Sequence, residues 1–293
     1  MADEAAIAGG LPGEQPAIRR ARPSDRQVLL DHLLRNPRDN LLLIDAAERV
    51  GRPPAPGEAP AHVLIGEVGG RVGCVATLQP MISLEADAPA SWFEAFLPYL
   101  AGVTSGLIKA PVDQADGLWR RIEATGRRKL LDRVEWGYAL APDALRPAPL
   151  PEGATERPAE RADLAELVEA ARQSLREENR PDPFRGDPTA FRSWVSARLS
   201  RARVLEHEGA LGFVGYADVR NASGWLIQGV YTPLAKRRHG FASAGVSRLC
   251  QHAFESGGSH VQLAVVEGNA AAEALYERLG FTRFARFRTI LFS

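Results

Sequence analysis

The sequence predicts a mixed α/β protein of two domains, each built on a mixed β-sheet flanked by helices. The 293 residues suffice for two domains of about 150 residues each. In the C-terminal half, apolar spacings alternate between strand and helix periods in the order β-α-α-β-β-β-α-β-α-β, and the N-terminal half repeats this rhythm less clearly. A proline-rich run separates the two halves.

Glycine and proline set the predicted domain boundaries. Residues 1–16 contain five of these residues in a polar context and are expected to be a flexible tail. Residues 142–153 contain four prolines, which disfavour both helix and central strand, so this run is interpreted as a linker. The predicted domains are therefore residues 17–141 and residues 154–293.

The composition argues against several classes of function. The formal net charge is zero, so neither nucleic acid nor a membrane surface is an expected partner. Cys74 and Cys250 lack metal-like or disulfide-like spacing and are expected to be reduced thiols. There is no secretory signal and no apolar run long enough to cross a bilayer, so we expect a cytoplasmic protein without a metal. Three lysines among 36 basic residues suggest a GC-rich bacterial genome, and the oligomeric state stays open.

The C-terminal half has the sharper pattern. A short strand is expected at residues 155–158, and apolar residues from Leu164 to Leu175 recur at helical spacing. A second helix is expected at residues 189–199, and Gly209 lies at the turn of a hairpin. The remaining expected elements are strands at 203–208, 211–220, 225–232, 261–266 and 282–292, a helix at 241–254, and a helix that starts at Asn269 and is ended by Gly280.

The N-terminal half is compatible with a second copy of the same fold. A glycine pair at residues 69–70 lies between two apolar runs and predicts a hairpin. The expected strands are 17–20, 61–68, 72–78, 106–109 and 130–140, and the expected helices are 25–34, 40–50, 92–100 and 116–125.

A short loop between a predicted strand and a predicted helix carries the first functional motif. It reads Arg237-Arg-His-Gly-Phe-Ala242 and follows Pro233. The amides of such a loop and the dipole of the next helix favour a bound phosphate. Gly240 allows close approach of a ligand, and Lys236 and Arg238 add positive charge. Taken alone, the pattern also suits a solvated basic loop.

A second motif begins 27 residues after Ala242 and reads Asn269-Ala-Ala-Ala-Glu-Ala-Leu-Tyr-Glu-Arg-Leu-Gly-Phe281. Together the two motifs resemble the acetyl-CoA-binding signature of the GCN5-related N-acetyltransferase (GNAT) superfamily. The phosphate loop of that family is written Gln/Arg-x-x-Gly-x-Gly/Ala, which Arg237, Gly240 and Ala242 match. The resemblance extends from about residue 154 to residue 293. It implies a GNAT fold for this half, acyltransferase activity, and acetyl-CoA as co-substrate.

The resemblance also implies roles for individual residues. The strands that end at Thr232 and start at Val261 should splay apart, leaving backbone groups free for the pantetheine arm. Tyr276 is the implied catalytic residue, which gives a proton or hydrogen bond to the leaving sulfur, although its position also suits packing. Asn269 contacts the cofactor in this picture and also suits a helix N-cap. His239 is interpreted as a loop residue and not as a base. The implied cofactor-binding residues are Val230, Tyr231, Thr232, Arg237, Arg238, His239, Gly240, Phe241, Ala242, Ser243 and Asn269.

The N-terminal half has neither motif. We therefore interpret it as a degenerate GNAT-like domain that binds no acetyl-CoA, within a tandem two-domain bacterial acetyltransferase. The run from Asn36 to Leu43 resembles other two-domain bacterial acetyltransferases. Likeness at the level of the fold does not identify a substrate.

The general base stays open. Where many relatives carry a glutamate, this chain has Gln228, which cannot accept a proton at useful pH. Glu206, Glu208, Asp218 and Glu267 are candidates, and a surface position explains each of them equally well. A water relay, or an amine that arrives neutral, would also serve.

The expected function is acetyl-CoA-dependent N-acetyl transfer to an amine of a small molecule or peptide, by direct attack in a ternary complex. A strand N–H near Val230 would stabilise the oxyanion. Glu177, Glu178 and Asp182 are candidates to line the acceptor site, and a solvated helix end explains them too. The alternative is a non-catalytic acyl-CoA-binding sensor or interaction module. Transfer of a longer acyl group is a second enzymatic alternative.

Overall fold

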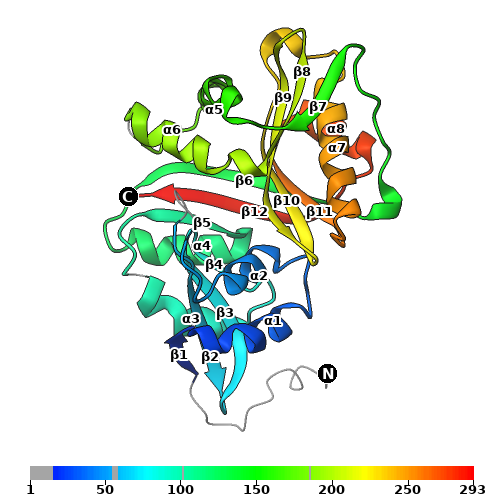
Figure 1. Ribbon diagram of the computed structural model, residues 1–293. Coiled ribbons are helices and arrows are strands. Elements are labelled where there is room, and N and C mark those ends of the chain that lie inside the picture. Colours follow the sequence, from blue (N-terminus) through cyan, green and yellow to red (C-terminus); the bar gives the residue numbers. More distant parts are fainter. Residues whose placement is uncertain (1–15, 55–58, 101, 185) are drawn as a thin grey trace. The chain divides into compact units, whose positions relative to one another are not determined.

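The computed structural model describes residues 16–54, 59–100, 102–184 and 186–293 (Figure 1). These residues form two compact units, each with its own core. The first unit contains residues 59–132 and 287–293 together with the described residues up to 54. The second unit contains residues 133–286. The predicted tail lies outside the described residues except for Pro16.

The N-terminal half of the chain confirms the predicted alternation of strands and helices. One short strand, β4, was not predicted, and the helix expected at 116–125 begins four residues earlier. In chain order the elements are β1 (Ala17–Arg20), α1 (Arg26–Leu33), α2 (Leu41–Glu48), β2 (His62–Val68), β3 (Arg71–Gln79), β4 (Ser83–Leu84), α3 (Ala90–Leu100), β5 (Gly106–Pro111), α4 (Val112–Glu123) and β6 (Lys129–Leu140).

The C-terminal half follows the same order of elements, so the two halves repeat one pattern. In chain order they are β7 (Ala154–Pro158), α5 (Leu164–Glu177), α6 (Pro188–Ala197), β8 (Ala202–His207), β9 (Ala210–Asn221), β10 (Gly224–Tyr231), α7 (Phe241–Glu255), β11 (Val261–Val266), α8 (Ala270–Leu279) and β12 (Thr282–Phe292). Each lies within a few residues of its prediction, because the apolar periodicity here is regular.

Each unit contains a strand from the other half of the sequence. In the second unit, β6 pairs antiparallel with β11, from Val261 opposite Leu140 to Val266 opposite Glu135. In the first unit, residues 287–292 of β12 pair antiparallel with β5. The predicted boundaries were therefore wrong at both ends: residues 133–141 belong to the second unit, and residues 287–293 belong to the first. Local sequence patterns predict strands but do not identify their partners.

The proline-rich run at 142–153 is not a free linker. It lies within the second unit, and Leu145, Ala148 and Leu150 pack against that unit's core. The Ala148 amide donates a hydrogen bond to the Ser247 hydroxyl at 3.1 Å, and the Arg146 amide donates one to the Leu279 carbonyl of α8 at 3.0 Å. Its prolines exclude regular structure without preventing tight packing.

The sheet of the first unit, with strand order β1-β2-β3-β4, has two apolar faces. Helices α1 and α2 pack with alternate residues of β2 and β3 on one face. Helices α3 and α4 form the other cluster together with β5 and the end of β12. Trp92 of α3 lies so close to the sheet that a Cβ on Gly66 would meet its ring at 2.4 Å.

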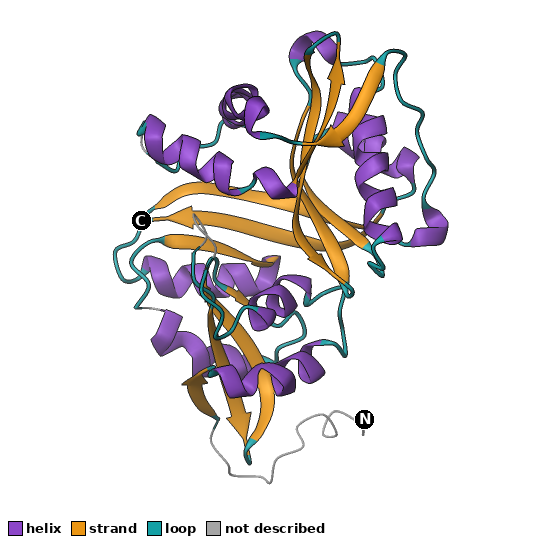
Figure 2. Ribbon diagram, in the orientation of Figure 1, coloured by secondary structure: helices purple, strands orange, loops and turns teal. Residues whose placement is uncertain are grey.

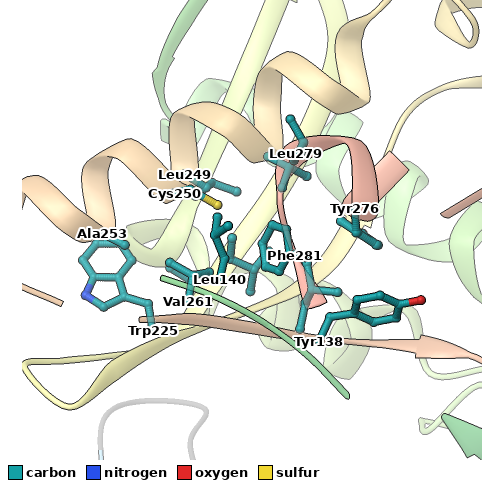
Figure 3. Packing of buried hydrophobic residues seen from close by; sticks show 14 of the residues in the cluster. Tyr138, Leu140, Trp225, Leu249, Cys250, Ala253, Val261, Tyr276, Leu279 and Phe281 are labelled. Carbon is teal, nitrogen blue, oxygen red and sulfur yellow. The ribbon is translucent and has the colours of Figure 1, made fainter. Parts of the chain in front are cut away.

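The second unit repeats this layering, with strand order β6-β11-β10-β9-β8-β7 (Figure 2). Helices α5 and α6 cover one face, in a cluster that includes Val204, Val214 and Tyr216. Helices α7 and α8 cover the other face, where Tyr276 and Phe281 pack with Tyr138 (Figure 3). Because side chains alternate along a strand, β8, β9 and β10 contribute to both cores.

The pairing of β12 with β5 predicts how a core substitution in β12 affects the stability of the first unit. Ile290 is fully buried in that unit's core. We expect Ile290→Ala to destabilise the first unit by about 2–5 kcal/mol, because it leaves a cavity. Hydrogen exchange should accelerate in β5 but not in β8 or β9. Val28→Ala, at a side chain that is 47% exposed, is the control. Faster exchange in β8 and β9 with β5 unchanged would contradict the assignment of residues 287–293 to the first unit.

Both cysteines are free and buried. Burial raises the pKa of the Cys74 and Cys250 thiols well above its usual range, so both stay protonated and poorly nucleophilic. Among the described helices, none is long and apolar enough to cross a membrane. The described residues also include no group of three or more His, Cys, Asp or Glu side chains placed to hold a metal ion.

Candidate active site

The parallel strands β10 and β11 diverge soon after they begin. They pair only through Trp225 opposite Val261 and Leu226 opposite Gln262. Beyond these pairs, β11 follows β6 and β10 follows β9. This confirms the predicted splay, which opens toward the C-terminal ends of both strands. Crevices at the carboxyl ends of parallel strands are common ligand sites in α/β folds.

A β-bulge interrupts β10 at the level of the splay. Gln228 lies opposite Tyr216 and Tyr231 lies opposite Val214, so β10 contains one residue more than β9 in this interval. Gly229 occupies the bulge with φ of 58°, a conformation that favours glycine. A bulge leaves the extra residue outside the regular ladder. On its other edge β10 has no paired strand beyond Leu226 among the described residues, because β11 has diverged.

The end of β10 contains a buried polar atom without a partner. Thr232 is 9% exposed, and its hydroxyl forms no hydrogen bond among the described residues. The carbonyl of Thr232 accepts a hydrogen bond from Arg237 Nε at 3.0 Å. An unpaired buried hydroxyl is unfavourable, so a polar ligand group in the splay would stabilise this position.

The loop between β10 and α7 has the backbone of an anion-binding site. Arg238 and Gly240 both have positive φ, of 66° and 85°. Gly240 is the N-cap of α7, and no side chain of the described residues caps this end of the helix. The first amides of α7, those of Phe241, Ala242 and Ser243, therefore stay available to a ligand. The nearest atom to a Cβ on Gly240 would be 3.9 Å away, so the approach is open.

The side chains of two of the three basic residues in this loop contact other side chains of the protein. Lys236 Nζ lies 2.8 Å from His207 Nδ1 and 3.4 Å from Glu208. Arg237 forms an ion pair of 2.6 Å with Glu177. The side chains of Lys236 and Arg237 are therefore engaged by protein groups, and the prediction that this loop binds a phosphate through its backbone amides is untested by these contacts. Arg238 is exposed and has no ion pair among the described residues.

Helix α8 presents the two remaining predicted site residues. Asn269 caps its N-terminus, where the side chain accepts a hydrogen bond from the Ala272 amide at 3.2 Å. This confirms the capping role of Asn269. The residue is exposed and directly follows the splayed end of β11, so its side chain lies on the same side as the open end of the splay.

Tyr276 of α8 is 7% exposed and packs against Tyr138 and Phe281, at 6.4 and 5.6 Å between ring centroids (Figure 3). Its hydroxyl has no hydrogen-bond partner in the described part of the chain. Burial raises the pKa of Tyr276, and the Cys250 thiol and the Glu178 carboxylate raise it further. Tyr276 thus serves in packing and also keeps a proton on a hydroxyl that lies within electrostatic range of a carboxylate.

The C-terminal end of α5 contacts β10 on one side of the splay and β6, the neighbour of β11, on the other. Glu177 accepts a hydrogen bond from the Tyr231 hydroxyl at the end of β10, at 3.2 Å, and pairs with Arg237. The adjacent Glu178 accepts a hydrogen bond from Arg133 of β6 at 2.9 Å. The third expected acceptor-site residue, Asp182, instead accepts amide hydrogen bonds from Phe184 and Gly186 and so shapes its own loop.

A comparison with protein families identifies this part of the chain. Residues 164–281, from the start of α5 to Phe281, match the model of the acetyltransferase (GNAT) family. This segment is a GNAT domain. The match includes the splay, the loop before α7 and Tyr276. Members of the family are generally acetyltransferases.

Solved structures share the fold over nearly the whole chain. A protein from Drosophila has a TM-score of 0.73 at 14% identity, covering 94% of this chain and 98% of its own. A GCN5-related N-acetyltransferase from Sphaerobacter thermophilus has 0.58 at 16%, covering 94% and 95%. A tandem GNAT protein from the clavulanic acid biosynthesis pathway has 0.56 at 14%, covering 94% and 98%. No curated protein matches the chain significantly.

Each carboxylate proposed from the sequence as a base in the GNAT domain forms an ion pair. Glu206 pairs with Arg157 at 2.9 Å, and Glu208 lies beside Lys236. Asp218 forms two hydrogen bonds to Arg198, and Glu267 pairs with Arg286 at 2.8 Å. None of the four is therefore an unpaired carboxylate in the described part of the chain.

The structure adds three charged residues that the sequence analysis did not select. Arg133 and the 2% exposed Glu135 lie on β6, and Arg180 directly follows α5. One signal was present in the sequence, because Glu135 interrupts a strand that is otherwise apolar near its C-terminal end. Its significance depended on β6 joining the sheet of the GNAT domain, which local patterns do not reveal.

Proposed function

We propose that the GNAT domain transfers acetyl from acetyl-CoA to an amine by direct attack in a ternary complex. One observation carries this proposal: the splay opens at the ends of β10 and β11, the loop 232–240 leads from β10 to the uncapped start of α7, and Asn269 comes three residues after the end of β11. An anion site and a groove with free backbone groups, arranged in this way, suit a nucleotide attached to an amide-bearing arm.

The residues of the splay fit the chemical groups of acetyl-CoA. The amides of residues 238–243 suit a pyrophosphate, because the helix end has no cap and the space beside Gly240 is open. The bulged backbone of Val230, Tyr231 and Thr232 suits the pantetheine amides, which would bond it as an added strand does. Asn269 would contact the cofactor from the opposite side while still capping α8.

Acetyl-CoA would supply a thioester, whose carbonyl carbon a neutral amine attacks and whose sulfur departs as a thiol. Tyr276 would hold its proton at the hydroxyl and give a hydrogen bond or proton to the departing sulfur. The backbone N–H next to Val230 would stabilise negative charge on the carbonyl oxygen. The amine loses a proton overall, to a carboxylate or to water.

The contacts of the loop before α7 predict that Arg238 contributes more to acetyl-CoA binding than Lys236 does. Arg238→Ala should weaken acetyl-CoA binding by about 5- to 20-fold, because it removes a charge near the pyrophosphate amides. Lys236→Ala is the matched control and should change the affinity by less than about 2-fold, since Lys236 is held by His207 and Glu208. Calorimetric titration measures both variants. S-acetylpantetheine, which lacks the pyrophosphate, should bind all three proteins equally. The same loss in both variants would contradict the assignment.

A non-catalytic acyl-CoA sensor is the second candidate. One observation favours it: all four carboxylates considered as the base are engaged in ion pairs. A sensor would bind acetyl-CoA with the same loop and the same splay. It would release no free thiol in the presence of any amine, and replacement of Tyr276 would have no catalytic consequence.

A further inference from the structure

A compact cluster of charges lies on the α5 side of the splay in the GNAT domain. Arg133 bridges two carboxylates, with Nη2 2.6 Å from Glu135 and Nη1 2.9 Å from Glu178. Arg180 Nη1 lies 3.6 Å from the same oxygen of Glu178. The four residues contain two positive and two negative charges, so the cluster is neutral overall. Together they form the charge cluster.

The alternation of β6 positions the charge cluster on the α5 face of the sheet. Tyr138 and Leu140 face the core formed with α7 and α8, so Arg133 and Glu135 face the opposite side. Glu135 is paired with Val266, the last residue of β11. This is the open end of the splay. The cluster therefore borders the opening on the side opposite α7 and α8.

Arg180 has a fixed position because α5 ends in a defined cap. Its amide donates to the Leu175 carbonyl at 2.8 Å, and the Asn179 amide donates to the Arg176 carbonyl at 3.1 Å. Asn179 has φ of 49°, so the three features together form a Schellman cap. The cap holds the backbone of Arg180 directly beside Glu178.

The positive side of the charge cluster is incompletely paired. Arg133 Nε is buried without a hydrogen-bond partner among the described residues. Among the described residues, Arg180 forms an ion pair only with Glu178, which also pairs with Arg133. Desolvation and the nearby Arg133 lower the pKa of Arg180, whose side chain is 40% exposed and shares Glu178 with Arg133. An anionic group beside Arg180 would relieve this imbalance.

The negative side of the charge cluster is the side nearest to the proposed chemistry. Glu178 pairs with Arg133 of β6, and Glu135 on the same strand lies opposite Val266, the last residue of β11. A cationic group bound by Glu178 would therefore lie at the open end of the splay. Arg180, which is the next residue but one in the chain, would lie next to that cation. The cluster thus offers a site for a cation and a site for an anion side by side.

We propose that the acceptor is a free α-amino acid, whose ammonium group is held by Glu178 and loses one proton to water before it attacks as the neutral amine, and whose carboxylate is held by Arg180. Arg133 and Glu135 act as positioning residues that hold Glu178. This inference rests on the proposed acetyl transfer. An α-amino acid bears both charges on one carbon, as the adjacent Glu178 and Arg180 require. A neutral cluster also favours a neutral zwitterion over a polyamine, which would need excess negative charge.

The test compares acceptors that differ only in the carboxylate. Wild-type protein and acetyl-CoA are incubated with each common amino acid, its primary amide and its decarboxylated amine, and free thiol and acetylated product are measured. The preferred amino acid should exceed its amide by about 10- to 100-fold in kcat/KM, as expected for a charge-assisted contact. Arg180→Gln should lower kcat/KM for the amino acid by a similar factor and leave that for the amide unchanged.

Arg176→Gln is the matched control, because Arg176 lies on the same helix end, is 61% exposed and pairs with Glu169. It should retain the preference, and Arg180→Lys should retain part of it. Amides or amines that react as well as amino acids would overturn the inference while leaving acetyl transfer intact. If no acceptor releases thiol, the proposed function fails. Binding of amino acids to the complex with CoA, measured by calorimetry, then decides the inference: binding that requires Arg180 supports it, and no binding overturns it.

Discussion

Tyr276→Phe is expected to lower kcat for acetyl transfer by about 100-fold or more, while acetyl-CoA affinity changes by less than about 2-fold. The substitution removes only the hydroxyl, so packing against Tyr138 and Phe281 is preserved. Burial raises the pKa of Tyr276, so the proton is present throughout the neutral range. Its loss should therefore lower kcat without changing the pH at which activity begins to fall. Steady-state kinetics and calorimetric titration measure the two effects.

Tyr138→Phe is the control for this prediction. The Tyr138 hydroxyl is held by Arg283 at 2.8 Å and lies 3.3 Å from Glu277. Because it already has protein partners, its removal should change kcat by less than about 5-fold. Equal losses in the two variants would indicate a general effect on packing. An unchanged kcat in Tyr276→Phe would show that Tyr276 has only a packing role.

Gly280→Ala is expected to destabilise the GNAT domain by about 3 kcal/mol or more. Gly280 ends α8 with φ of 101°, and a Cβ there would lie 2.0 Å from the Ala144 carbonyl oxygen. Both the backbone conformation and the space exclude a side chain. For a unit of about 150 residues this loss corresponds to a Tm lower by about 6–12 °C. Thermal unfolding followed by circular dichroism measures the change.

Gly268→Ala separates the two causes. Gly268 also has positive φ, of 91°, but nothing lies within 4 Å of the position of its Cβ. Its replacement should cost only the backbone strain, about 1–2 kcal/mol. If both variants lose the same stability, the run at 142–153 does not pack against the end of α8. A larger loss at Gly280 supports that packing.

The sequence was most informative where local chemistry determines structure. Regular apolar spacing predicted α7 and β11 almost to the residue, and glycine and asparagine predicted both ends of α8. The loop motif predicted a glycine where the backbone is open and a helix that starts just after it, and the structure adds the positive φ of Gly240 and the missing side-chain cap of α7. The chemical roles of these residues stay predictions.

The sequence was least informative where contacts join distant residues. Nothing local to residues 133–140 or 287–292 shows that each run pairs with a strand of the other half. For the same reason Glu135 was not selected, and the ion pair between Arg237 and Glu177 was not predicted. Prolines in residues 142–153 indicated irregular backbone correctly, but they did not indicate that the run is packed.

One reaction tests the central claim most directly. Wild-type protein is incubated with acetyl-CoA carrying a labelled acetyl group and with a panel of amino acids and amines, and thiol release and labelled product are followed together by mass spectrometry. We predict equal amounts of free thiol and N-acetylated product, both dependent on the acceptor and both reduced about 100-fold in Tyr276→Phe. Tight acetyl-CoA binding without acceptor-dependent thiol release across the whole panel would contradict acetyl transfer and would support a sensor.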